Sequence, residues 1–184
     1  MKSRLLLSIV LLLFIGTATF GQGFTKPAEG KSVIYIMKLQ AGFSTTFLFN
    51  GEEFIGKLKS KSYVRYECDP GDYTFMSLVG ATKAFLTAEL EADQIYIVEI
   101  RLTSQAIGGE LPLFVNVNTD KPKFTNKFLP LANSQAPFGK DEALKTKMEK
   151  KWKKFTQKAN AKFEAKLKAK NKHTVITKDM FYQK

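Results

Sequence analysis

Short runs of β-branched and aromatic residues, separated by turn residues at intervals of about 8 to 12, fill the middle of this chain. This rhythm is typical of an all-β sandwich or barrel, and no helical period of comparable length interrupts it. The sequence therefore predicts a mainly β fold, an antiparallel β-sandwich of about seven to eight strands. We expect strands near residues 33–38, 43–49, 53–58, 63–68, 73–79, 83–90, 95–103 and 111–118.

Several of these runs alternate strictly between apolar and polar residues. In the run 95–103, Tyr96, Val98 and Ile100 share one side, and Glu99 and Arg101 share the other. One face of each such strand is expected to form the core.

Turn residues connect the expected strands. Asn50-Gly51 is a favoured pair for a tight hairpin, because both residues tolerate positive φ. Pro70-Gly71 predicts a second hairpin, and Pro112 places the last strand at a sheet edge, because proline has no N–H to donate.

Four segments carry a resemblance to a known family: VIYIM at 33–37, FNGEEFIGKL at 49–58, YVRYECDPGDYTF at 63–75 and QIYIVEI at 94–100. Together they make residues 31–118 similar to the bacterial domain-of-unknown-function family 2846, with turns like those of PEGA-type surface β domains. The resemblance implies an exported β-sandwich of unestablished activity. Many members of that family are lipoproteins, and this chain departs from them because it has no cysteine near its amino terminus.

The first 21 residues have the layout of a secretory signal peptide. Lys2 and Arg4 precede an apolar run at 5–15, which is about half the roughly 20 residues that a membrane-spanning helix needs. We expect cleavage after Gly21 and a product in the periplasm or outside the cell, associated with the cell envelope but not anchored through a cysteine. Cys68 is the one cysteine of the chain and has no partner for an internal disulfide.

The positive charge of the chain is segregated. The formal net charge is +12, yet residues 22–139 hold 12 basic and 12 acidic residues, whereas residues 140–184 hold 15 lysines and five acids. This distribution disfavours a uniformly basic domain that coats nucleic acid. The predicted organisation is a β-sandwich over 22–118, a linker over 119–139, a basic amphipathic helix over 140–172 with Asp141 as its N-cap, and a tail over 173–184.

Two series of residues run along the predicted helix. The first is an apolar stripe spaced by three or four residues, Leu144, Met148, Trp152, Phe155, Phe163 and Leu167, together with Ala159. The second is a series of lysines spaced by four, Lys150, Lys154, Lys158, Lys162, Lys166 and Lys170. Like charges at this spacing disfavour a helix by roughly 0.2 to 0.5 kcal/mol per pair, a cost that an anionic partner would remove.

The apolar stripe must be covered, because each large side chain gains roughly 1.5 to 3 kcal/mol on burial. The helix could pack on its own β domain or on a second copy, which would make it purely structural. It could instead bind a bilayer, with lysines reaching lipid phosphates, or bind an acidic protein or an envelope polymer. The leading hypothesis is an exported, non-enzymatic adaptor that presents these six lysines to an anionic surface or partner.

Catalytic residue patterns are sparse. Cys68 is expected to fill the core, and the one histidine, His173, lies about a hundred residues away. Two pairs of carboxylates, Glu52 with Glu53 and Asp69 with Asp72, fall at expected hairpin ends, where acids commonly solvate turns. We therefore expect no catalytic site, no metal site and no cofactor.

Overall fold

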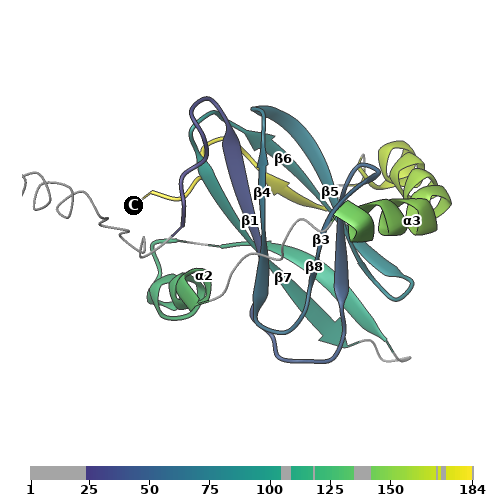
Figure 1. Cartoon of the computed structure of the whole chain (residues 1–184), viewed down its shortest axis with the longest axis horizontal. Coiled ribbons are helices and arrows are strands. Elements are labelled where there is room, and N and C mark those ends of the chain that lie inside the picture. The colour runs from purple at the N-terminus through teal and green to yellow at the C-terminus, as the bar shows by residue number, and fades with distance from the viewer. Residues whose placement is uncertain are drawn as a thin grey trace, which may run out of the picture.

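The computed structural model describes residues 24–104, 109–117, 119–134, 142–168, 170 and 173–183. The predicted signal peptide at 1–21 and the predicted N-cap Asp141 lie outside these residues. Within them, two β-sheets pack face to face, and a helical segment covers the outer side of each sheet (Figure 1).

The sheets contain nine strands between them in the part of the chain that the structure describes. The first sheet has the order β4 (Ser62–Cys68), β1 (Ser32–Lys38), β7 (Ile95–Ser104) and β8 (Glu110–Asn116). The second has the order β3 (Glu53–Leu58), β2 (Thr46–Asn50), β5 (Gly71–Val79), β6 (Thr82–Leu90) and β9 (Thr174–Ile176). The predicted mainly β fold is confirmed, and the eight expected strands correspond to β1 to β8.

Both sheets are mixed rather than purely antiparallel. β1 pairs in parallel with β7, and β6 pairs in parallel with β9, while the other pairings are antiparallel. Parallel neighbours need a long connection, and in both pairs the intervening chain passes through the opposite sheet or the C-terminal helix.

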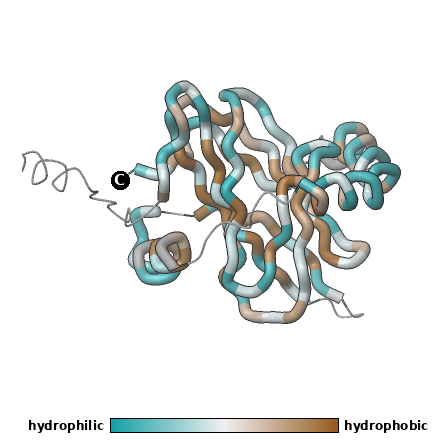
Figure 2. The backbone as a smooth tube through the Cα atoms, in the orientation of Figure 1, coloured by the Kyte–Doolittle hydropathy of each residue, from teal (hydrophilic) through white to brown (hydrophobic). Residues whose placement is uncertain are grey.

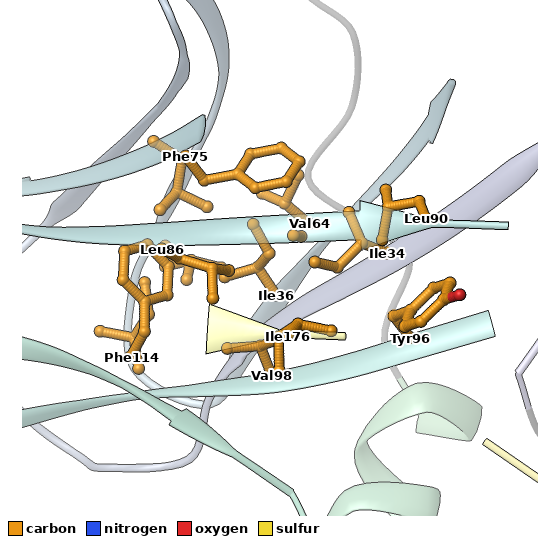
Figure 3. Packing of buried hydrophobic residues seen from close by; sticks show 14 residues of the cluster. Ile34, Ile36, Val64, Phe75, Leu86, Leu90, Tyr96, Val98, Phe114 and Ile176 are labelled. Atoms are coloured by element: carbon orange, nitrogen blue, oxygen red, sulfur yellow. The ribbon is translucent and has the colours of Figure 1, made fainter. Parts of the chain in front are cut away.

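The core lies between the sheets, where side chains from both inner faces interdigitate (Figure 3). Its members include Ile34 and Ile36 from β1, Leu86 from β6 and Val98 from β7. The predicted inner face of β7 is confirmed, because Tyr96, Val98 and Ile100 all belong to this core.

The two predicted hairpins have different outcomes. Asn50-Gly51 joins the paired strands β2 and β3, with Gly51 at a φ of +55°. The hairpin predicted at Pro70-Gly71 is wrong, because β4 lies in the first sheet and β5 in the second, so this corner carries the chain between sheets. A proline-glycine turn has the same local geometry whether or not its flanking strands pair, which is why local sequence did not distinguish the two.

The predicted linker is partly helical. The π-helical turn η1 (Phe124–Phe128) and α2 (Leu129–Ser134) pack on the outer face of the first sheet. Phe124, Phe128 and Leu131 are buried there, and Leu129 is half-buried. On the opposite side, α3 (Glu142–Lys162) and the π-helical turn η2 (Phe163–Leu167) lie against the second sheet. Figure 2 shows α3 as mainly hydrophilic and the strands as rich in hydrophobic residues.

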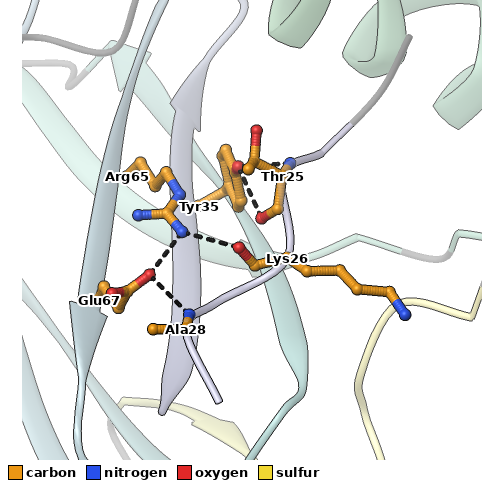
Figure 4. A network of polar contacts seen from close by, with 6 residues as sticks. All are labelled: Thr25, Lys26, Ala28, Tyr35, Arg65 and Glu67. Atoms are coloured by element: carbon orange, nitrogen blue, oxygen red, sulfur yellow. Dashed lines mark hydrogen bonds and ion pairs between the residues drawn. The ribbon is translucent and has the colours of Figure 1, made fainter. Parts of the chain in front are cut away.

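The amino-terminal segment before β1 covers the edge strand β4. Arg65 donates to the carbonyl of Lys26 (3.1 Å) and pairs with Glu67 (2.6 Å), whose carboxylate accepts the backbone N–H of Ala28 at 3.3 Å (Figure 4). Side chains therefore satisfy backbone groups of a segment that has no strand partner of its own.

Candidate anionic-surface site on the C-terminal helix

The apolar stripe of the helix is covered by the second sheet. Phe163 has no exposed surface, and its ring stacks on Phe85 of β6 with centroids 4.3 Å apart. Ala159 is also buried there, and four further predicted members of the stripe are partly buried against the same cluster: Leu144, Met148, Trp152 and Phe155. The side chain of Leu167 lies outside the described residues. The sequence left open what packs against the apolar stripe of the helix. In the structure it is the protein's own β domain.

A set of polar contacts fixes α3 to the β2–β3 hairpin. Lys145 Nζ lies 2.7 Å from Glu53 Oε1, and the backbone N–H of Phe54 donates to Glu149 Oε1 at 3.1 Å. Gln157 Nε2 donates to Glu52 Oε2 at 3.1 Å. The hairpin glutamates expected only to solvate a turn therefore serve as docking points for the helix.

Glu53 belongs to a wider network inside the hairpin. Its Oε2 accepts the hydroxyl proton of Tyr66 (2.9 Å), and the Tyr66 oxygen accepts from Asn50 Nδ2 (3.0 Å). Burial, together with the bond to Glu53, raises the pKa of Tyr66. The bond to Glu53 likewise raises the pKa of Lys145, which favours the charged form of the lysine.

The six predicted surface lysines are all exposed: Lys150, Lys154, Lys158, Lys162, Lys166 and Lys170. None forms an ion pair with another residue that the structure describes. The acids that reach α3 from the sandwich bind Lys145 and Gln157 instead. The positive charge of the helix is thus left largely facing solvent.

The lysines wind around the helix rather than forming one straight row. Because an α-helix has about 3.6 residues per turn, each step of four residues rotates the side chain by about 40°. The four members within α3 therefore spread over roughly 120°. An arc of this width can face one surface, and Lys147 and Lys151, both exposed, lie within or beside it. The single four-residue spacing does not include these two residues, so the sequence pattern did not predict them.

The cleft between α3 and the β2–β3 hairpin has a volume of about 540 Å³. Its lining combines Glu52, Glu53 and Glu149 with Lys150 and Lys153. Since Glu53 and Glu149 are already engaged in docking, the cleft presents mixed charge and no free pair of carboxylates for acid–base chemistry.

The other candidate reactive residues are Cys68, His173 and Asp69, and each has contacts of its own. Cys68 is half-buried on the inner face of β4, and burial raises the pKa of its thiol, which disfavours the nucleophilic thiolate. The His173 ring packs edge-on against Phe163 with centroids 5.1 Å apart, and Asp69 pairs with Lys31 at 2.6 Å. Among the described residues, no three His, Cys, Asp or Glu side chains are grouped to hold a metal ion.

Among the helices of the described ranges, none combines the length and the apolar character required to cross a bilayer.

Comparisons with known proteins add little. No family model and no curated protein sequence matches the chain. A solved structure described as the NMR structure of a protein from Eubacterium rectale covers 53% of this chain and 100% of its own, at 11% identity and a TM-score of 0.28. A likeness this weak carries no argument about fold or function.

Proposed function

We propose that this protein is an exported, non-enzymatic binding protein of the cell envelope, in which the β-sandwich holds α3 and presents its lysines to an anionic surface. The observation that carries the proposal is the division of the helix: its apolar side lies on the sheet, while all six lysines are exposed and unpaired among the described residues. In this form, binding is electrostatic and peripheral. The apolar residues stay on the sheet and do not enter the bilayer.

Electrostatics supplies the expected strength. A lysine near an anionic membrane contributes roughly 1 kcal/mol, and the attraction fades within a Debye length of about 8 Å at physiological salt. Four lysines in one arc are therefore enough for binding that depends steeply on salt.

Cosedimentation with vesicles tests the proposal, using protein that begins at Gln22. Mixed phosphatidylcholine and phosphatidylglycerol vesicles should bind the protein at low salt, and pure phosphatidylcholine vesicles should not. The variant Lys154→Glu/Lys158→Glu should lose binding by more than about tenfold, following the per-lysine contribution above. The matched control Lys26→Glu/Lys178→Glu changes the net charge equally at exposed sites away from α3 and should bind nearly as well as the unchanged protein.

Equal loss of binding in both variants would show that net charge alone matters, and would overturn the role of α3. The absence of binding to anionic vesicles would remove the membrane version. The docking of α3 on its own sheet favours a second candidate, a purely structural helix, and that absence would support it.

A further inference from the structure

A groove with a different chemistry lies on the opposite side of the molecule. It opens on the outer face of the first sheet, between the end of β1, the β3–β4 turn and the η1–α2 segment, and has a volume of about 560 Å³. This falls within the range of about 300 to 1,000 Å³ common for small-molecule sites. The residues that matter for its chemistry are Leu39, Lys61, Glu99, Lys123, Lys127 and Leu131.

Three cations converge on this groove from two distant parts of the sequence. Lys61 comes from the β3–β4 turn, and Lys123 and Lys127 come from the segment around η1. All three are exposed, and none forms an ion pair with a described residue. Their positive charges are therefore available to an anion that enters the groove.

The acid that lines the groove is already neutralised. Glu99 is 3% exposed, and its Oε2 accepts from both Nε and an Nη of Arg101 at 2.7 Å. This Glu99–Arg101 pair contributes no net charge, so the three lysines make the charge of the groove lining positive.

Two leucines, Leu39 and Leu131, belong to the apolar part of the groove lining, and both are held in place. Leu131 is buried in the cluster beneath α2, and Leu39 packs against the same cluster. The side chain of Gln40 donates to the backbone carbonyl of Leu102 at 3.1 Å, which ties the wall that begins at Leu39 to β7. The groove is therefore formed before any ligand arrives.

The backbone at Lys61 adds an independent observation. Its φ is +47°, in the left-handed region where glycine or asparagine is preferred. The turn around it is closed by Ser62, whose hydroxyl accepts from the N–H of Lys59 at 2.9 Å. A lysine thus occupies a position that glycine would fill with less strain, and its side chain lines the groove.

We propose that this groove binds a single-chain anionic amphiphile, such as a fatty acid or an alkyl phosphate. The lysines bind the anionic head group, and the first carbons of the chain lie on Leu39 and Leu131. An inorganic anion would bind the lysines but leave the two leucines uncovered, and a neutral alcohol would cover the leucines but leave the lysines without an anion. The site is separate from the lysines of α3.

Isothermal titration calorimetry tests this with dodecanoate and dodecyl phosphate below their micelle concentrations. Both should bind with one site per protein, whereas inorganic phosphate and dodecanol should bind at least about tenfold more weakly, because each lacks half of the interaction. Equal affinity for inorganic phosphate would reduce the site to an anion site, and binding of vesicles without binding of monomeric amphiphile would overturn the proposal.

The variant Lys123→Gln/Lys127→Gln should weaken dodecanoate binding by about tenfold, since each exposed charge pair contributes up to about fivefold in affinity. The matched control Lys26→Gln/Lys178→Gln should leave the affinity unchanged. Unchanged affinity in the groove variant would overturn the proposal.

Lys61→Gly separates binding from stability. Glycine relieves the left-handed backbone, so this variant should unfold at the same or a higher temperature and yet bind dodecanoate several-fold more weakly. Full affinity in Lys61→Gly would remove Lys61 from the site. The α3 variant Lys154→Glu/Lys158→Glu should bind dodecanoate normally, so failure of the groove proposal and failure of the proposed function are distinguishable.

Discussion

At the scale of single residues, Lys38 at the end of β1 is the least expected feature. Its side chain has no exposed surface, and its Nζ donates to the carbonyl of Ser44 at 2.6 Å. Burial lowers the pKa of Lys38, and the charge of Glu110 opposes this shift only in part. The buried amine fixes the base of the β1–β2 loop, which carries the fully exposed Phe43, at a cost in desolvation.

This pKa shift makes stability depend on pH. The folded protein holds the Lys38 proton less tightly than the unfolded chain, so the penalty is complete below the lowered pKa. It disappears as the pH rises through that value towards the ordinary 10.5. Lys38→Met should raise the free energy of unfolding at pH 7 by roughly 1 kcal/mol, and should remove the gain in stability that the unchanged protein shows on going to alkaline pH. Urea unfolding across this range checks it, with the exposed Lys59→Met as control. Parallel pH profiles for Lys38→Met and the unchanged protein would contradict it.

At the scale of elements, α3 depends on the sheet for its position. A helix this rich in lysine is destabilised by repulsion between neighbours in the (i, i+4) series. Beyond the end of α3, Lys168 pairs with Glu164 of η2 at 3.2 Å. The packing of Phe163, Ala159 and their neighbours on the second sheet offsets that repulsion.

Phe163→Ala should therefore detach the carboxyl-terminal half of the helix. The expected loss is about 3 to 5 kcal/mol in the free energy of unfolding, as for other buried phenylalanines. Amide hydrogens along α3, which should exchange slowly in the unchanged protein, should then exchange faster. Phe43→Ala removes the same side chain from a fully exposed position and should change neither quantity. Fast exchange along α3 in the unchanged protein would show that the docking is weak.

At the scale of the whole molecule, the two ends of the described chain meet. The Tyr182 ring lies 5.4 Å from that of Phe24 and 5.2 Å from that of Phe124, between centroids. Its backbone N–H donates to the carbonyl of Ile95 at 2.7 Å. One aromatic cluster thus joins the segment before β1, the η1 turn and the tail after β9.

Tyr182→Ala should loosen both ends together. We expect a loss of roughly 3 kcal/mol in the free energy of unfolding, and faster proteolysis of the segments around residues 24–31 and 177–183 at the same time. Val175→Ala, at a residue with 47% of its surface exposed, serves as the control. Cleavage that accelerates at one end alone would show that the two segments are held independently.

Much of the architecture follows from local patterns. Runs of β-branched and aromatic residues between turn residues predicted the eight strands of the sandwich body. In several of them the alternation of apolar and polar residues also predicted the core face, because side-chain direction in a strand has a period of two. The three- and four-residue spacing likewise predicted α3 and its apolar stripe. The assignment of β4 and β5 to different sheets could not be predicted. The residues of a turn determine the local dihedral angles but not whether the flanking strands pair.

The packing of helical segments on the outer faces of the sheets was harder to predict from the sequence. β2 carries Phe47 and Phe49 on the side away from the core, where a solvated sheet would have polar residues, and these rings now lie in the cluster beneath α3. Two phenylalanines on the outer side of one strand indicate that this face of the sheet is buried as well.

Charge shows most clearly the difference between what the sequence determines and what the tertiary structure determines. Composition by itself determined that the carboxyl-terminal region is basic, since 15 lysines cannot be balanced by five acids wherever the chain goes. The same count made residues 22–139 neutral, yet folding brings Lys61 beside Lys123 and Lys127, and pairs the nearby Glu99 with Arg101. Net charge is a sum over residues and survives any fold. Electrostatic potential depends on the distances between charges, which the tertiary structure alone decided.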